Sequence, residues 1–234
     1  MKGEEFLCEI KNSYNVINVL SERNGNKVLL LKHKKIGRKL VLRYQEKKQE
    51  VYCFLKSISF ENLPEIYDVY ELEDAFIVLE EYIDGISVAQ VLESGVYTYR
   101  GAKKVISGVC DALCVLHENG YVHRDIKPEN IMVSRDGTVK LIDFNVSRSV
   151  KNNIRRDTFI MGTFGYAPPE QLGISQSDSR TDLYALGVLL NVMLTGKHPS
   201  EALVSGRARH IVLKCTQISP EKRFHSVSEL KNYL

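Results

Sequence analysis

The apolar residues of this chain change their arrangement near residue 82, and this change limits the possible folds more than any other feature of the sequence. Before it, stretches rich in Val, Leu and Tyr at 14–20, 27–31 and 39–44 are separated by turn residues, as in consecutive β-strands. After it, apolar residues recur three and four positions apart, which is the spacing of one buried helix face. We therefore predict an α+β fold with a strand-rich N-terminal part and a helical C-terminal part.

The same patterns predict further elements along the chain. We expect one long helix over 102–116, and Asn119-Gly120 is a suitable stop for it. Helices are also expected at 51–58, 183–194 and 208–215, and strands at 65–72 and 76–79.

The composition is that of an ordinary globular domain and excludes several classes of protein. Of the 234 residues, 44% are hydrophobic and 26% are charged, so the chain has enough apolar material for a core. The net charge of +3 is too small to indicate binding to nucleic acid or to a membrane surface, and no apolar run is long enough to span a bilayer. Five cysteines without a C-x-x-C pair argue against a disulfide framework or a zinc site and favour a cytoplasmic location.

One segment carries most of the chemical information: His-Arg-Asp-Ile-Lys-Pro-Glu-Asn at 123–130, followed by an expected hairpin. Apolar strands at 131–133 and 139–142 flank the turn Ser-Arg-Asp-Gly, and Asp-Gly between apolar runs is typical of a β-hairpin. Asn130 precedes the first strand and Asp143 follows the second. Because the start of one strand lies beside the end of its antiparallel partner, we expect these two side chains to lie together.

The polar side chains of this segment fit phosphoryl transfer. An amide oxygen and a carboxylate are suitable ligands for Mg²⁺ with bound phosphates, so Asn130 and Asp143 are candidate metal ligands. Asp125 can accept a proton from an attacking hydroxyl, and Lys127 can neutralise charge on a transferred phosphoryl group. For any one of these residues alone, a solvated loop charge is the ordinary alternative, whereas the whole octapeptide followed by Asp143-Phe144 favours chemistry.

The pattern His-Arg-Asp-x-x-x-x-Asn followed by Asp-Phe resembles the eukaryotic-type (Hanks-type) Ser/Thr protein kinase family, in its compact bacterial form. The resemblance extends over essentially the whole chain. Residues 162–170 are similar to the segment that closes the activation loop, and 180–187 to the helix that buries an Asp beneath the catalytic loop. Residues 220–223 are similar to the late Pro-x-x-Arg, whose Arg pairs in the family with the Glu matched here by Glu170.

This resemblance implies a fold, an activity and partners. The fold is a single bilobal protein kinase domain over 1–234, with an N-lobe over 1–81 and a C-lobe over 82–234. The activity is transfer of the γ-phosphoryl group of Mg-ATP to a Ser or Thr hydroxyl of a protein substrate, because Lys127 and Gly162-Thr163 are similar to the Ser/Thr branch of the family. No nucleic-acid partner is implied, and the oligomeric state is left open.

The resemblance also implies which residues contact the nucleotide. The linker around Glu81 and Ile83 offers backbone groups to adenine, with Val28 above the ring and Met132 below it. Each of these apolar residues is otherwise more often a plain core residue. Arg43 stands where the family has a lysine, and it is expected to contact the nucleotide phosphates with a different reach and geometry.

The N-terminal part departs from the family pattern in several places. Counting back from Val28 puts Ser21, Arg23 and Asn26 at the positions of the three glycines of the phosphate-binding loop, so an ordinary hairpin turn fits this segment equally well. The acidic partner of Arg43 is expected at Glu50, with Glu46 as an alternative. In the C-terminal part, Asn145 replaces the Gly of Asp-Phe-Gly, a mild change because Asn tolerates left-handed backbone geometry.

Two questions stay open at the level of the sequence. One is the regulatory phosphosite, for which Thr158 is the first candidate and Thr163 the second, with Arg124 as a possible phosphate partner. The other is whether the chain catalyses phosphoryl transfer or only binds nucleotide. Arg43 and the altered loop favour a pseudokinase that binds nucleotide or acts as a scaffold, whereas Asp125 and the metal ligands favour an active enzyme. A small-molecule phosphotransferase is a third interpretation, but it lacks the segment seen here at 162–170.

Overall fold

The computed structural model describes residues 3–23, 25–149, 165–172 and 178–234, which form two compact units. Unit 1 consists of Met1–Phe60 and Pro64–Ile83, and unit 2 of Glu61–Leu63 and Asp84–Leu234. The boundary after Ile83 lies beside the change of pattern at residue 82.

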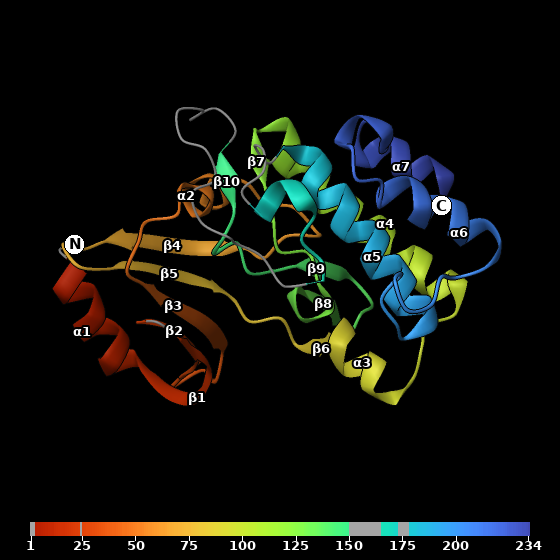
Figure 1. Cartoon of the computed structure of the whole chain (residues 1–234). Coiled ribbons are helices and arrows are strands. Elements are labelled where there is room, and N and C mark those ends of the chain that lie inside the picture. Colours follow the sequence, from red (N-terminus) through yellow and green to blue (C-terminus); the bar gives the residue numbers. More distant parts are fainter. Residues whose placement is uncertain (1–2, 24, 150–164, 173–177) are drawn as a thin grey trace. The chain divides into compact units, whose positions relative to one another are not determined.

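Unit 1 contains an antiparallel five-stranded sheet in the order β1-β2-β3-β5-β4 (Figure 1). Val, Ile, Leu and Tyr dominate its strands, and such side chains pack well on a pleated surface. The strands are β1 (Tyr14–Arg23), β2 (Asn26–His33), β3 (Lys39–Gln45), β4 (Ile66–Glu71) and β5 (Phe76–Glu81). Each overlaps a stretch for which the sequence predicts a strand.

A helix that the sequence analysis does not predict, α1 (Gly3–Ser13), packs on one face of this sheet. Its Phe6 is buried and stacks on Tyr70 of β4 with ring centroids 3.7 Å apart. Leu7 and Ile10 contact the same hydrophobic cluster. Figure 1 shows α1 in red beside β1 and β2. This helix therefore removes from water the sheet face formed by such residues as Leu31 and Leu42.

The second helix of unit 1, α2 (Glu50–Lys56), confirms the expected short amphipathic helix. Val51, Tyr52 and Leu55 are its buried residues. At its C-terminal end Lys56 Nζ lies 2.5 Å from Asp68 of β4.

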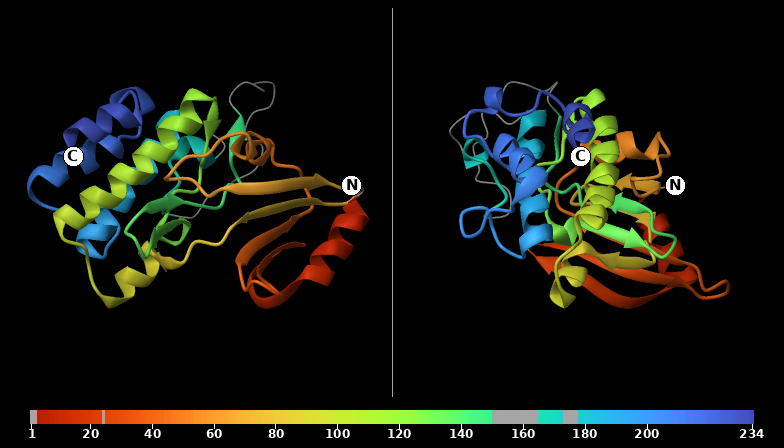
Figure 2. Two further views of the ribbon diagram at one scale, coloured as in Figure 1. Left: turned by 180° about the vertical axis from the view of Figure 1, so that it is seen from behind. Right: turned by 90° about the vertical axis from the view of Figure 1, so that its right-hand side faces the viewer.

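Unit 2 is mainly helical, and the views of Figure 2 show its long helices side by side. The helix predicted over 102–116 is α4, which starts after the N-cap Thr98 and ends before the C-cap Asn119, with Gly120 at φ 81°. The helices are α3 (Val88–Ser94), α4 (Tyr99–Glu118), α5 (Ser179–Thr195), α6 (Gly206–Cys215) and α7 (Val227–Tyr233). Within the described residues, none of the helices combines the length and apolarity needed to cross a membrane.

The described residues of unit 2 also form two small antiparallel sheets and three short 3₁₀ helices. One sheet has the order β6-β8-β9 and includes the predicted hairpin, whose turn has Gly137 at φ 85°. Asp136 Oδ1 accepts a hydrogen bond from the Thr138 N–H in this turn (2.9 Å). The strands are β6 (Gly85–Ser87), β7 (Tyr121–Val122), β8 (Ile131–Ser134), β9 (Val139–Leu141) and β10 (Arg148–Ser149), and the 3₁₀ helices are η1 (Pro128–Asn130), η2 (Pro169–Leu172) and η3 (Pro220–Lys222).

Candidate active site

The segment 123–130 lies in unit 2 between β7 and β8, and a buried carboxylate beneath it fixes its backbone. Asp182 of α5 is fully buried and accepts hydrogen bonds from the backbone N–H groups of His123 (2.9 Å) and Arg124 (2.8 Å). Its Oδ2 also lies 2.8 Å from His117 Nε2 of α4. This arrangement confirms the buried Asp that the resemblance implies, and it ties the segment to two long helices.

The surroundings of Asp182 keep its carboxyl group ionised despite complete burial. Burial by itself raises the pKa of this group, but the hydrogen bond and charge of His117 and the His123 backbone N–H more than offset that effect. The pKa of Asp182 is therefore lowered, and a carboxylate is available to accept all three hydrogen bonds.

The His123 ring connects the segment to the end of β9. Its Nδ1 accepts a hydrogen bond from the Asp125 N–H (3.3 Å), so the ring proton lies on Nε2, which faces the Ile142 carbonyl oxygen at 3.2 Å. The ring packs edge-on against Phe144, with centroids 5.1 Å apart. Burial lowers the pKa of His123 and keeps the ring neutral.

Asp125, Lys127 and Asn130 form the centre of the candidate site. Lys127 Nζ lies 2.7 Å from Asp125 Oδ2, and Asn130 Nδ2 donates to the same oxygen at 2.9 Å and to the Asp125 carbonyl oxygen at 2.9 Å. The side chains of Asp125 and Lys127 are only 12% and 21% exposed. Two donors thus hold one carboxylate oxygen in a fixed position in a site largely shielded from solvent.

The hairpin places Asn130 beside Ile142, the residue before Asp143, while the expected meeting of the Asn130 and Asp143 side chains stays a prediction. The Ile142 N–H donates to the Asn130 carbonyl oxygen (2.9 Å), and Asp143 is the next residue. Asp143 and Arg124 both have φ 67°, a left-handed conformation that is costly for residues other than glycine and that occurs most often at functional sites. The Arg124 N–H donates to Asp182 and its carbonyl oxygen accepts from Gln171, and these bonds hold Arg124 in this conformation.

The donor set at this edge of the hairpin fits a hard cation. The hydrogen bonds of the Asn130 amide described above use Nδ2, so Oδ1 is the atom that would coordinate a metal. Together with the Asp143 carboxylate it supplies the oxygen ligands that Mg²⁺ takes from a protein when phosphates and water complete the shell.

In unit 1, Arg43 lies where the family resemblance requires a phosphate-contacting cation. Strand register places Val28 of β2 opposite Arg43 of β3, and Arg43 opposite Val78 of β5, on one face of the sheet. Arg43 is buried and forms an ion pair with Glu80 of β5, with Nε 2.7 Å from Oε1. The sequence analysis missed Glu80, although the two-residue alternation of β5 places it on the same face as Val78.

The acidic residue expected to pair with Arg43, Glu50, is exposed in the first turn of α2. Its role stays a prediction. The structure adds Glu80, from the neighbouring strand, as a buried partner of Arg43.

The segment that matches the phosphate-binding loop is a tight hairpin. Strands β1 and β2 pair as far as Arg23 and Asn26, and only two residues join them, with Gly25 at φ 76°. Ser21 is paired with Val28 inside this ladder. The backbone here is thus a paired hairpin, and whether it approaches the nucleotide phosphates stays a prediction.

The residues expected to contact adenine lie in both units. Glu81 ends β5, Ile83 is buried at the end of unit 1, and Met132 is half-buried in β8 of unit 2. Their contact with a nucleotide stays a prediction. The phosphosite candidates Thr158 and Thr163 lie outside the described residues.

Two further contacts support the loop that carries Asp125. Arg223 pairs with Glu170 in the buried interior, with Nη2 2.9 Å from Oε2, as the resemblance implies. Next to Glu170, Gln171 donates from Nε2 to the Arg124 carbonyl oxygen (2.7 Å). The sequence analysis did not identify Gln171, whose contact is visible only in three dimensions.

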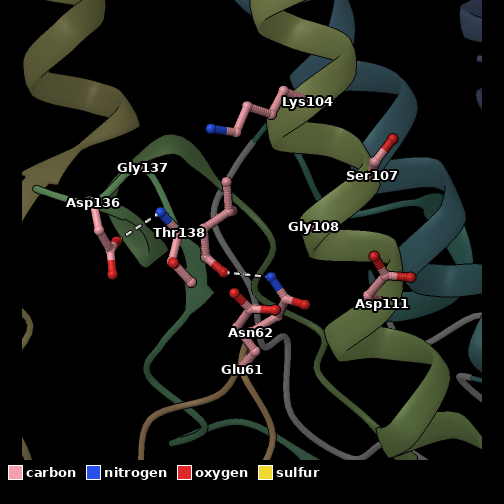
Figure 3. Close-up of a pocket in the computed structure, with 10 residues that line it drawn as sticks. Glu61, Asn62, Lys104, Ser107, Gly108, Asp111, Asp136, Gly137 and Thr138 are labelled. Carbon is pink, nitrogen blue, oxygen red and sulfur yellow. Dashed lines mark hydrogen bonds between the residues drawn. The ribbon is translucent and has the colours of Figure 1, made fainter.

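The hairpin is also held along its outer strand by residues 61–63, which belong to unit 2. Asn62 Nδ2 donates to the Val139 carbonyl oxygen (2.7 Å), and the Leu141 N–H donates to the Asn62 carbonyl oxygen (2.9 Å). Figure 3 shows the first of these bonds beside a polar pocket of about 390 Å³ between α4 and the hairpin turn. The residues lining this pocket are Glu61, Asn62, Lys104, Ser107, Gly108, Asp111, Asp136, Gly137, Thr138 and Val139.

Comparison with known proteins agrees with this geometry. The protein kinase domain family matches residues 13–232 of the chain. The chain therefore belongs to the protein kinase family, and its relatives place it among the Hanks-type Ser/Thr protein kinases.

Three of these relatives illustrate the degree of similarity. The chain is 32% identical over 205 residues to the serine/threonine-protein kinase PknB of Mycobacterium tuberculosis, and 31% identical to PknB of Mycolicibacterium smegmatis; each match covers 73% of this chain and 33% of the relative. It is 34% identical over 161 residues to a probable serine/threonine-protein kinase of Clostridium perfringens, covering 67% of this chain and 24% of the relative. The chain thus spans a third or less of the length of the curated relatives it matches.

Proposed function

We propose that this chain is a Ser/Thr protein kinase that uses Mg-ATP to phosphorylate a Ser or Thr hydroxyl of a protein substrate. The observation that carries this proposal is the arrangement around Asp125. Its carboxylate is held by Lys127 and Asn130, and the Asn130 backbone is bonded to the residue before Asp143. These side chains supply the orienting base, the cation and the metal ligands that phosphoryl transfer needs.

Each residue of the candidate site has a separate task in this proposal. Asp125 accepts the hydrogen bond of the acceptor hydroxyl and takes its proton as the new O–P bond forms. At the same time the bond between the γ-phosphorus and the β–γ bridging oxygen breaks, and ADP leaves with that oxygen. Lys127 neutralises charge on the transferred group, while Asn130 Oδ1 and the Asp143 carboxylate hold the metal. When bound, Mg²⁺ would neutralise the negative charge of the nucleotide phosphates. Arg43 contacts those phosphates, and adenine lies against Val28, Glu81, Ile83 and Met132.

A transfer assay tests the proposal. The chain is incubated with γ-labelled ATP, Mg²⁺ and a protein acceptor rich in Ser and Thr, and the labelled amino acid is identified after hydrolysis. We expect label on Ser or Thr that disappears when the divalent cation is chelated. Nucleotide binding without any transfer, over a range of metals and acceptors, would establish the pseudokinase alternative, which the tight β1–β2 hairpin and Arg43 favour.

We further propose a cytoplasmic location. All five cysteines are free thiols in the structure, and burial raises the pKa of Cys110 and Cys215, which keeps these two in the unreactive thiol form. Cysteines that remain as free thiols are typical of proteins in a reducing compartment. Cell fractionation with thiol labelling tests this, and a protein recovered with oxidised cysteines outside the cytoplasm would contradict it.

A further inference from the structure

Arg43 and Glu80 form an ion pair inside unit 1 that the proposed function does not yet explain. The two side chains are only 6% and 5% exposed, and Arg43 Nε lies 2.7 Å from Glu80 Oε1. They belong to neighbouring strands, where Arg43 is opposite Val78 and Glu80 is opposite Val41. They are therefore diagonal neighbours on one face of the sheet, and the strand register alone brings them together.

This pairing differs in origin from the one that the sequence predicts. The expected partner, Glu50, belongs to α2, so a contact with it would depend on the position of a helix. The contact with Glu80 is fixed by two hydrogen-bonded strands. Removing one member of such a buried pair leaves the other charge without a partner in the interior. Loss of Arg43 or Glu80 alone therefore lowers the stability of unit 1.

The atom that makes the contact suits an arginine and does not suit a lysine. The guanidinium of arginine is planar and carries donors on more than one edge. Its Nε–H can bind a carboxylate while the edge formed by the two Nη atoms binds a second anion. That Nη edge is the one that binds two phosphate oxygens at once. Lysine has three donors on one side-chain nitrogen, so a contact with Glu80 and a contact with phosphate would both have to be made by the same atom.

We propose that Glu80 is a positioning residue that orients the Arg43 guanidinium toward the nucleotide phosphates, and that Arg43 and Glu80 act as a matched pair. The proposal rests on the proposed function, because it assumes that Arg43 contacts a nucleotide. It explains why an arginine at the family's lysine position occurs together with a buried acid on the next strand.

A double-mutant cycle on the full chain tests this coupling. Binding of Mg-ADP is measured by calorimetry for the wild type, Arg43→Lys, Glu80→Gln and the double variant. We expect Arg43→Lys to weaken binding about tenfold or more when Glu80 is present and far less in the Glu80→Gln background, because the uncharged amide no longer captures the ammonium group. Glu80→Leu removes the side contact altogether, and we expect it to weaken binding about tenfold as well.

Two controls separate positioning from folding. Glu71→Gln changes an exposed strand acid that pairs with Lys48 at 2.6 Å, and it leaves nucleotide affinity unchanged. The apolar double variant Arg43→Met with Glu80→Met keeps the stability of unit 1 close to wild type in urea unfolding, because apolar pairs replace buried ion pairs well, yet it loses nucleotide affinity.

The possible outcomes distinguish the two proposals. If the wild type binds Mg-ADP and the fold-changes of the two single variants simply multiply in the double variant, Glu80 does not position Arg43 and this inference is wrong. Unchanged affinity in Glu80→Leu has the same consequence. If the wild type binds no nucleotide at all, the proposed function itself is wrong, and the inference fails with it.

Discussion

The segment around Asp125 in unit 2 and the strands around Arg43 in unit 1 preserve the family pattern to very different degrees. Around Asp125, every side chain that the resemblance requires is present, and backbone hydrogen bonds to buried Asp182 hold the loop. Around Arg43, the lysine is replaced, the glycine positions lie in paired strands, and a new acid, Glu80, is buried beside the cation.

This difference follows from what each region contributes to phosphoryl transfer. In the proposed function the loop residues contact the reacting groups, where a displacement of about 1 Å is costly, and a buried carboxylate and a left-handed Arg124 fix the loop. The strands contribute mainly binding of the nucleotide, which different side chains can achieve. The proposed function therefore expects the first region to determine whether transfer occurs, and the second how tightly nucleotide is held.

A large effect is expected for Asp143→Asn, which tests the contribution of unit 2 to phosphoryl transfer. Loss of a charged metal ligand should lower the rate of phosphoryl transfer about 10³-fold, because metal catalysis supplies several kcal/mol of charge stabilisation. The measurement is label transfer over a range of Mg²⁺ concentrations. Asp111→Asn, which alters an exposed pair with Lys231, is the matched control and should retain the wild-type rate.

The next largest effect is expected for Arg223→Met, which leaves the Glu170 carboxylate buried without its partner. We expect the free energy of unfolding to fall by about 3–5 kcal/mol, measured by urea unfolding. Arg135→Met removes an exposed pair with Asp84, whose side chains are 82% and 54% exposed, and serves as the control. Equal losses in both variants would contradict the structural role assigned to the Glu170 pair.

Acid should destabilise unit 2 in two steps because its buried groups titrate differently when unfolded. The pKa of His123 is lowered in the fold, so below its ordinary value of 6.5 the unfolded chain binds a proton that the folded chain does not, and stability falls. The pKa of Asp182 is also lowered, so its contribution is present above its ordinary value of 3.8 and is lost as the pH falls through its value in the fold.

Urea unfolding at a series of pH values tests this dependence. Below pH 6.5 we expect a slope of up to about 1.4 kcal/mol per pH unit from His123. His123→Asn, which keeps a hydrogen-bonding side chain without a titrating ring, should flatten that part of the curve. An unchanged slope in this variant would assign the effect to another group.

The smallest effect is expected for Gly25→Ala in the β1–β2 turn. Gly25 has φ 76°, so alanine should cost about 1–2 kcal/mol of unfolding free energy. The KM for ATP should change by no more than about twofold, since the proposed function assigns the phosphate contact to Arg43 and not to this turn. A much larger change in KM with little loss of stability would break the proposed contrast between the two regions.

The sequence predicts the strands, the long helices and the hairpin because each has a local pattern. It also predicts that Asn130 and Asp143 lie at the same end of the hairpin, since antiparallel pairing is a simple geometric rule. It does not predict α1, although Phe6, Leu7 and Ile10 have helical spacing, because the charged residues around them mask the short apolar face. Glu80 is missed for another reason. Pairing across a sheet depends on strand register, which becomes known only when the strand order is known.

The central claim is that the Asp125 site transfers phosphate, and one paired measurement tests it most directly. Wild type and Asp125→Asn are compared for transfer of label from γ-labelled ATP to a Ser/Thr acceptor, and for Mg-ADP affinity by calorimetry. We expect transfer to fall by about 10²–10⁴-fold while affinity and unfolding midpoint stay at the wild-type level. Transfer at the wild-type rate in Asp125→Asn would contradict the account.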